Sequence, residues 1–350
     1  MNTFDVMRDL ERRRKSIQIK SILPMVVFFV LFFGMQTFMM NATMVTLFPL
    51  LMFGSMGLIV FFSFQTAKER KEFKQIYKDT FVVGAIREIL GNVTYNPMFG
   101  FSEYDVAKTG IVQMGNRFSS EDYIEGYWDG VHFRQSDVVV KRVTGSGKNK
   151  HTYVHFSGRL FEFDCPLDGN VSTLLFSKNY EYPGHGLGLR YEKIKMENEA
   201  FNKRFKIKAA RDIDAFYVLT PQMMECIDNI LMKAKSVGLH FANNKLYLGI
   251  NSGGKGAFDA RMNRPLVYAD EIAKIKADTQ VIIDIVRTLK LDQNARQEQI
   301  RNFGGVMDPI AQLNQRTTQQ TGQINGEAQE GNTYFNQQPI ESNFGFTLKQ

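Results

Sequence analysis

The sequence predicts an α+β protein, in which an N-terminal two-helix transmembrane hairpin and a stalk helix precede an antiparallel-sheet domain with packed helices and a disordered C-terminal tail. Three observations support this fold class. The segment from Ile22 to about Phe64 contains no Lys, Arg, Asp or Glu. Residues 122–176 are rich in β-branched and aromatic side chains, separated by tight turns. After about Asn302, Gln, Asn, Gly and Thr dominate and aliphatic residues become scarce.

The uncharged segment is about twice as long as the ~20 residues that one helix needs to cross a membrane. Asn41-Ala42-Thr43 is short and polar enough for a tight turn, so we predict two spans, roughly 22–40 and 44–64. The first span holds about eleven Leu, Ile, Val or Phe residues, which favour insertion by about 3–7 kcal/mol at roughly 0.3–0.6 kcal/mol each. A cleaved signal peptide is rejected because a second span follows within a few residues.

Basic residues flank the hairpin on both sides, and the short turn between the spans has none. Positive charge stays on the cytoplasmic side of a membrane, so we predict that both termini and nearly the whole chain are cytoplasmic. Residues 1–21 then form a basic cytoplasmic N-terminus. The side chains expected at the membrane surface are Arg12, Arg13, Arg14, Lys15, Lys68, Arg70 and Lys71.

The formal net charge of +7 is concentrated in the two flanks of the hairpin. Residues 1–21 and 68–78 each contribute +3, which leaves about +1 for the rest of the chain. This distribution suits anionic lipid and differs from a nucleic-acid footprint. The expected partner is therefore a lipid bilayer and not nucleic acid. Cys165 and Cys226 are far apart in the sequence, as in proteins of a reducing compartment, and are expected to be buried rather than reactive.

Residues 65–112 are predicted to be juxtamembrane helices. Apolar residues recur at helical spacing from 65 to 90 among Lys, Arg and Glu, and Gly91-Asn92 ends that helix. Ser102 begins a capping box with Asp105, which predicts a short helix through Ile111.

Residues 113–302 are predicted to form the cytosolic α+β domain, as one domain or two. Asp129-Gly130 and Asn243-Asn244 are turn sequences typical of β-hairpins, and Thr220-Pro221 is a strong helix start. A Gly-, Pro- and Tyr-rich loop at 177–190 is a candidate seam. The predicted strands are 123–127, 131–143, 152–157, 160–164, 171–176, 193–196, 205–209, 215–219, 239–242 and 245–250. The predicted helices are 199–203, 221 to about 238, and 270–289.

No local catalytic or metal-binding motif stands out. Gly145-Ser146-Gly147-Lys148 lacks the spacing of a phosphate-binding loop and lies between two predicted strands, so we interpret it as a hairpin loop. The five histidines have no Cys or Glu at metal-ligand spacing. We therefore predict no catalytic residues, no cofactor and no metal.

One acidic and aromatic segment, residues 121–128, gives a candidate interaction site. Its three carboxylates lie beside three aromatic residues in the sequence. Carboxylates with aromatic rings suit a sugar or a cation, but a strand entry with a solvated face is the favoured interpretation. The residues singled out as a candidate interaction or ligand site are Asp122, Glu125, Trp128 and His155.

The Gln/Asn-rich segment 303–350 is predicted to be disordered, because it cannot bury enough apolar surface to offset the entropy of ordering. Phe344-Gly345-Phe346 leaves open a short docking motif, although a bare tail is the favoured interpretation.

Several segments of the domain occur in a characteristic order: SSEDYIEGYWDGVHFRQSDV, HFSGRLFEFD, ENEAFNKRFKIKAARDIDAFYVLTPQMMECI, NNKLYLGI and DIVRTLKLD. Together they resemble a bacterial family, catalogued as domain-of-unknown-function family thirty-one thirty-seven, over roughly residues 115–292. FYVLTPQMMECI after FNKRFKI is the most specific part. The resemblance implies a two-span protein of the bacterial inner (plasma) membrane with a cytosolic domain. The resemblance implies no particular activity and identifies no catalytic residues.

Two functional hypotheses follow. The first is a non-enzymatic, membrane-anchored interaction module that binds a protein or lipid partner at the inner face of the membrane. The second is a membrane-tethered enzyme or small-ligand sensor whose site is assembled from distant residues such as Asp122, Glu125 and His155. A pocket lined by two or more of these would favour the second, and a flat apolar patch the first. Self-association into a homo-oligomer through the hairpin stays open, although neither span contains G-x-x-x-G.

Overall fold

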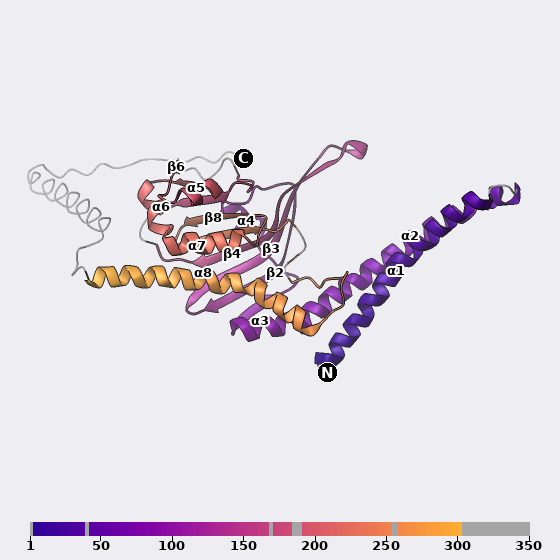
Figure 1. Cartoon of the computed structure of the whole chain (residues 1–350), viewed down its shortest axis with the longest axis horizontal. Helices are drawn as coiled ribbons and strands as arrows, with labels where there is room; N and C mark the ends of the chain where they lie inside the picture. Colours follow the sequence, from indigo (N-terminus) through magenta and orange to yellow (C-terminus); the bar gives the residue numbers. More distant parts are fainter. Residues whose placement is uncertain are drawn as a thin grey trace, which may run out of the picture. The chain divides into compact units, whose positions relative to one another are not determined.

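The computed structural model describes residues 3–38, 42–167, 171–183, 191–253, 256 and 258–302 (Figure 1). The chain divides into two compact units, Met1–Lys290 and Leu291–Gln350. From the second unit the structure describes only the end of one helix. The tail predicted at 303–350, with its docking motif, lies outside the described residues, as does the second half of the loop predicted at 177–190.

Two long helices begin the described chain, α1 (Thr3–Phe38) and α2 (Ala42–Tyr77), and they pack against each other (Figure 1). Each has a stretch that is long and apolar enough to cross a membrane; these stretches lie in Asp5–Gly34 and in Leu50–Leu90. Both helices are therefore candidate membrane spans. Helix α1 starts well before the predicted span because its first turns pack into the core of the domain.

Helix α2 does not stop at the predicted end of the second span. It continues through a π-helical segment (Lys78–Val82) into α3 (Val83–Leu90), and Gly91 ends the helix with a φ of +77°. The helix predicted over 65–90 is thus confirmed. Short π-helical segments are frequent at functional sites, and here the first residue of the segment, Lys78, is buried.

Among the described residues, nine strands form one antiparallel sheet, which confirms the α+β class and the large antiparallel sheet. The strand order is β1-β2-β3-β4-β9-β8-β5-β7-β6. The strands are β1 (Val93–Asn96), β2 (Arg117–Trp128), β3 (Val131–Thr144), β4 (His151–Asp164), β5 (Thr173–Ser177), β6 (Glu192–Ile194), β7 (Phe205–Ala209), β8 (Ser236–Ala242) and β9 (Lys245–Asn251). The other helices are α4 (Glu103–Lys108), α5 (Glu199–Arg204), α6 (Asp212–Val218), α7 (Pro221–Leu231) and α8 (Tyr268–Asn302), with a 3₁₀ turn at Gly147–Asn149.

Some predicted elements are wrong, and contacts in the structure explain two of them. The strand expected at 215–219 is part of α6, whose first turn carries acidic residues and an ion pair between Arg211 and the buried Asp214 at 2.7 Å. The two strands expected around Gly158 are one strand, β4. A Cβ at Gly158 would overlap the carbonyl oxygen of Ile250, so this glycine permits close pairing with β9 and does not break the strand.

Three further elements differ from the prediction. Helix α7 ends at Leu231 and not near Gly238, because β8 already begins at Ser236. Strand β1 pairs with β2 where the sequence suggested only a break. The short helix after Ser102 has the predicted capping box but ends at Lys108.

The sheet is covered on both faces, as the alternation of strand residues shows. Phe133 of β3 lies in a large apolar cluster that also contains residues of α1, α2, α3, α7 and α8. Val138 and Val140 of the same strand lie in a second cluster, with Val106 of α4 and Ile111. Since side chains alternate between the faces of a strand, the two clusters pack on opposite faces. The first ties the beginning of α1 and the end of α2 to the sheet.

The turn between β8 and β9 gives a testable expectation. Asn243 and Asn244 have φ values of +54° and +56°, as a two-residue hairpin turn requires. Replacing Asn243 with valine should lower the free energy of unfolding by about 1–2 kcal/mol, because a β-branched residue is strained at positive φ. Asn243→Gly should leave stability nearly unchanged. Urea unfolding followed by circular dichroism compares the two variants, and equal stabilities would contradict the turn geometry.

A row of charged side chains crosses β3, β4 and β9. Glu162 of β4 is buried and contacts Arg134 at 2.6 Å and Lys245 at 2.8 Å. Burial acts to raise the pKa of Glu162, but the hydrogen bonds from Lys245 and Arg134 outweigh burial, so the pKa is lowered. An acid whose pKa is lower in the folded state contributes stability above its unfolded pKa. That contribution disappears as the pH falls through the folded pKa.

We therefore expect Glu162→Gln to cost about 1–3 kcal/mol of unfolding free energy at pH 7. The cost should vanish at a pH below the folded pKa of Glu162, where the wild-type carboxyl is also neutral. Unfolding of both proteins across an acid series measures this. Glu125→Gln on β2 is a matched control, since that carboxylate is 41% exposed. A difference between Glu162→Gln and wild type that is independent of pH would contradict the assignment.

Candidate functional site

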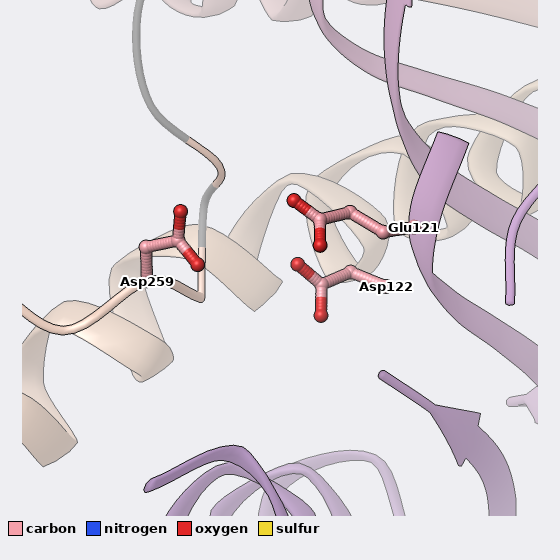
Figure 2. Close-up of side chains that lie close together, drawn as sticks. All are labelled: Glu121, Asp122 and Asp259. Atoms are coloured by element: carbon pink, nitrogen blue, oxygen red, sulfur yellow. The ribbon is translucent and has the colours of Figure 1, made fainter. Parts of the chain in front are cut away.

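A partly buried charge network joins the end of α2 to the sheet. Lys74 and Lys78 lie one helical turn apart. Together they contact the carboxylates of Glu121, Asp122 and Asp259, and Figure 2 shows these three carboxylates close together. The Lys78 ammonium lies 2.5 Å from Asp122, 3.4 Å from Asp259 and 3.6 Å from Glu121. Lys74 contacts Glu121 at 2.8 Å and Asp259 at 2.9 Å. We call these five residues the ion-pair network.

The local backbone explains how Asp122 reaches the interior. The register between β2 and β3 shifts between Glu121 and Ile124, which marks a β-bulge, and Asp122 has a φ of +60°. Asp122 is fully buried, and its carboxylate also accepts a hydrogen bond from Tyr95 at 2.6 Å. The favoured sequence interpretation, a solvated strand entry, is thus wrong for Asp122. Its physical reason is the bulge, which turns one acidic residue of the strand inward.

The three carboxylates also have the geometry of a metal-ligand set. One oxygen from each of Glu121, Asp122 and Asp259 lies within 4.8 Å of the others. The positive charge at this place is supplied by the chain, because the ammonium groups of Lys74 and Lys78 contact the same carboxylates. A metal ion would have to displace a buried ammonium that already has hydrogen-bond partners. The arrangement therefore favours a structural ion-pair network over a metal centre.

Burial disfavours the charged form of each titratable group in the network, so it acts to raise the pKa of the acidic groups and to lower the pKa of lysine. Burial raises the pKa of Asp122, against the Lys78 charge and the hydrogen bonds that lower it. Burial acts to lower the pKa of Lys74, but its bonds to Glu121 and Asp259 raise it overall. Burial also raises the pKa of Tyr95, so its hydroxyl stays a neutral donor to Asp122. The network thus keeps Lys74 charged at neutral pH.

Beside the network lies a cavity of about 520 Å³. Its lining includes Glu121, which belongs to both. The other lining residues come from β2, β3, β4, β9, α8 and nearby loops: Met98, Ser119, Ser120, Asp137, Val138, Val139, Gly158, Arg159, Lys233, Ile250, Ser252, Gly256, Lys274 and Asp278. Three cationic and three acidic residues line this cavity, so it is polar and mixed in charge.

Helix α8 contributes two charged residues to the cavity wall. Arg159 donates a hydrogen bond to the backbone carbonyl of Asp278 and lies 3.8 Å from its carboxylate. Lys274 donates to the backbone carbonyl of Asp259 at 2.6 Å, which connects the cavity wall with the ion-pair network. Burial raises the pKa of Asp278 and lowers the pKa of Lys274. Burial thus disfavours the charged form of both side chains, and an oppositely charged neighbour stabilises that form.

The four residues singled out from the sequence have separate surroundings. Asp122 belongs to the network. Glu125 accepts from Tyr123 at 2.8 Å and lies 3.2 Å from His132. Neither residue lines the cavity described above.

Trp128 and His155 lie at two further places. Trp128 is packed against the large apolar cluster, with the Arg287 guanidinium 5.7 Å from its ring centre. The Nδ1 atom of His155 lies 2.6 Å from the carboxylate of Glu181. The structure therefore gives no shared site to Asp122, Glu125, Trp128 and His155.

The basic residues expected at a membrane surface divide into two groups. Arg14 is buried and binds Glu11 at 2.7 Å, together with Gln18 and the carbonyl of Met262, so it fixes α1 to the domain. Arg12, Arg13, Lys15, Lys68, Arg70 and Lys71 are exposed. Only this second group has the accessibility that contact with a membrane requires.

One pattern in the sequence indicates that Lys78 is buried, although the distribution of net charge assigned this residue to the flank of the hairpin. Lys74 and Lys78 were counted with the flanking charges of the hairpin. Yet Phe73, Tyr77 and Phe81 repeat at intervals of four residues, and the structure buries all three. Lys78 precedes the buried Phe81 and Val82 by three and four residues, and residues at these spacings lie on the same face of a helix. Asp259 lies in a Gly-rich loop, and no sequence pattern pointed to it.

Two comparisons with known proteins complete this description. Residues 154–291 match the model of a family described as "Protein of unknown function (DUF3137)". This part of the chain, from β4 into α8, therefore resembles an uncharacterised domain family, over a shorter range than the expected 115–292. The match includes Asp259 and leaves out Lys78 and Asp122.

A search of solved structures matches the crystal structure of the mycobacterial trehalose monomycolate transport factor A, TtfA. The identity is 8%, the match covers 58% of this chain and 95% of that chain, and the TM-score is 0.29. A score this low carries no argument about the fold or the function. No curated protein matches the chain.

Proposed function

We propose that this chain is a membrane-anchored interaction module. In this proposal α1 and α2 span the membrane as a hairpin and carry the sheet domain at its inner face, where the domain binds a protein or lipid partner. The observation that carries the proposal is that the burial of apolar side chains changes along both helices. One part of each helix is packed in the domain core, and the other part exposes apolar side chains.

The change occurs at the same level in both helices. In α1, Leu10 and Ile17 are buried, whereas from Ile19 to Phe33 most apolar side chains are exposed. In α2, Phe73 and Tyr77 are buried in the core, whereas most apolar side chains from Leu50 to Phe64 are exposed. The exposed apolar side chains of α2 are Leu50, Leu51, Phe53, Met56, Leu58, Val60, Phe61 and Phe64. A soluble protein rarely leaves an apolar patch this large in contact with water.

A polar layer marks the border between the two parts. Lys20 of α1 contacts Glu69 of α2 at 2.5 Å, and Arg70 donates to the Ser21 hydroxyl at 2.9 Å. From Ser21 to the end of α1 at Phe38, the helix is about 27 Å long at 1.5 Å per residue. The hydrocarbon core of a bilayer is about 30 Å thick. The apolar part of α1 thus fits one crossing.

The orientation follows from the exposed basic residues on the domain side of this border, which include Arg12, Lys15, Lys68 and Lys71. Positively charged flanks favour the cytoplasmic side, so the proposal places the domain in the cytoplasm of a bacterial cell. The membrane is then the inner (plasma) membrane.

Carbonate extraction and cysteine accessibility of the full chain test the proposal. Single cysteines replace Arg12 and Gln75, two exposed positions on the domain side of the border. The chain should stay in the membrane pellet, and both cysteines should react with an impermeant maleimide in inverted vesicles but not in intact spheroplasts. The parent chain, with buried Cys165 and Cys226, gives the background. Release of the chain by carbonate, or labelling from outside, would refute the anchor or its orientation.

Partner binding needs its own test, namely crosslinking in intact cells followed by affinity purification and mass spectrometry of the full chain. We expect a reproducible membrane-associated partner or a second copy of the chain. Recovery of neither would remove the partner from the proposal and leave the anchor untouched.

The cavity beside the ion-pair network favours a second candidate function, a small-ligand sensor. Lys233 and Lys274 offer ammonium groups in the cavity wall, and Arg159 adds a guanidinium. Such a wall suits a small molecule with an anionic group. A thermal-shift screen of small carboxylates and phosphates on the full chain tests this function. Stabilisation that disappears in Lys274→Ala would support it, and equal stabilisation of both proteins would reject it.

A further inference from the structure

The outer halves of β3 and β4 form a narrow arm, which ends in the hairpin loop predicted at Gly145-Ser146-Gly147-Lys148. We define the basic arm as residues 141–154. Strand β2 pairs with β3 only as far as Lys141, and β9 pairs with β4 only from Gly158 onwards. Beyond these points the two strands pair only with each other, and Figure 1 shows them leaving the sheet as a two-stranded ribbon with the 3₁₀ turn at its end.

The base of the arm is fixed to the sheet. The Asn116 side chain donates to the carbonyl of Val143 at 2.7 Å and accepts from its amide at 2.8 Å. This pair of hydrogen bonds holds the arm at Val143, two residues beyond the last pair between β2 and β3. The arm therefore has a defined register and leaves the sheet at a defined place.

The arm has a strong charge excess. Residues 141–154 contain four basic and no acidic side chains, a net charge of +4. These four are Lys141, Arg142, Lys148 and Lys150, and all of them are exposed. The chain outside the hairpin flanks has a net charge of only about +1, so acidic residues elsewhere in that part balance most of the positive charge of the arm. The net charge alone therefore does not reveal the arm.

Two exposed apolar side chains accompany this charge. Tyr153 is 57% exposed and Val154 is 52% exposed. Arg142 pairs with Tyr153, and Lys141 pairs with Val154, so each face of the ribbon carries a basic residue opposite an apolar one. An isolated two-stranded ribbon is marginally stable in water. The arm has no core beneath it, so contact with another surface would add the stability that its own packing lacks.

We infer that the basic arm binds the anionic headgroups of the membrane in which α1 and α2 are anchored. Lys and Arg near a membrane are attracted by its negative surface potential, and tyrosine favours the interface, where its ring is half in apolar surroundings and its hydroxyl is in water. One aromatic residue does not make the stacking platform that single-stranded nucleic acid requires. The inference rests on the proposed function, because it needs the membrane to be close.

The test uses the full chain in nanodiscs of phosphatidylcholine alone or of phosphatidylcholine mixed with phosphatidylglycerol. An environment-sensitive fluorophore on Ser146→Cys, at the tip of the arm, reports contact with lipid. We expect a blue shift of the emission only in the anionic nanodiscs. Raising the salt concentration should reverse the shift, because the Debye length falls from about 10 Å at 0.1 M to about 3 Å at 1 M.

Charge reversal provides the matched variants. Lys148→Glu with Lys150→Glu should abolish the blue shift. Lys193→Glu with Lys206→Glu changes the net charge equally at exposed positions of β6 and β7, and it should preserve the shift. The same emission in both kinds of nanodisc would overturn the inference, as would equal effects of the two charge reversals.

Incorporation into the nanodiscs separates this inference from the proposed function. If the full chain does not co-elute with lipid, the membrane anchor fails and the arm inference falls with it. If the chain co-elutes but the tip fluorophore does not respond to anionic lipid, the anchor stands and only the arm inference is overturned. An acidic protein partner for the arm would give this second result.

Discussion

Replacing Lys78 with methionine is expected to lower the free energy of unfolding by about 3–5 kcal/mol, because the change leaves the buried Asp122 without its charged partner. The side chain of Lys78 is 2% exposed and that of Asp122 is 0% exposed. Methionine has a similar length and fills most of the space, so the loss measures the charge more than a cavity. Chemical unfolding of the full chain in detergent, followed by circular dichroism, measures the difference.

A double-mutant cycle tells the ion pair apart from simple packing. Lys78→Met with Asp122→Asn removes both charges, and its cost should be clearly less than the sum of the two single costs. Lys74→Met is the matched control on the same helix, one turn earlier. Its side chain is 36% exposed, so its loss should cost about 1 kcal/mol or less. Additive costs, or equal losses for Lys74→Met and Lys78→Met, would show that the buried pair has no special role.

The ion-pair network matters for the proposed function because of its position. Lys74 and Lys78 follow the border residues Glu69 and Arg70 on α2 and contact strand β2 and the Asp259 loop. Arg14 performs a similar task for α1 through the carbonyl of Met262. Both helices thus enter the domain through buried charged contacts as well as apolar packing. Such contacts fix the register between the helices and the sheet, because apolar packing alone tolerates small shifts.

Local signals in the sequence predicted much of the fold. The turn at Asp129-Gly130, the asparagine turn before β9 and the Thr220 cap all involve neighbouring residues, and the structure confirms each of them. The apolar parts of α1 and α2 were visible because they are long and without charge. These features depend on backbone chemistry within a few residues, so a single sequence contains the information.

The candidate site was less predictable because it depends on distant contacts. Asp122 is buried through a bulge whose partner residues lie on β3, and its countercharge comes from Lys78, 44 residues earlier. Asp259 joins the network from the other end of the domain. Gly158 looked like a strand break because its close neighbour, Ile250, is far away in the sequence. In each case the deciding interaction is tertiary, and no local pattern contains it.

Arginine in the middle of both apolar stretches should prevent stable anchoring in the membrane. Val30 and Phe53 lie near the centres of the two proposed spans and are exposed, at 65% and 76%. An arginine at the centre of a span costs about 2.5–3.5 kcal/mol on the insertion scale. Each span therefore loses about 2.5–3.5 kcal/mol, which is a large part of the gain of about 3–7 kcal/mol expected for insertion of the first span.

The measurement is the fraction of chain that stays in the membrane pellet after carbonate extraction, which should fall from nearly all to a minor part. Gln75→Arg with Ala107→Arg is the matched control, because it adds the same charge at exposed helical positions outside the apolar stretches. This control should pellet like the wild type. If Val30→Arg with Phe53→Arg also pellets like the wild type, the exposed faces of α1 and α2 do not contact lipid. They would then have to be covered by another protein or by a second copy of the chain, since apolar side chains on this scale are not left in water.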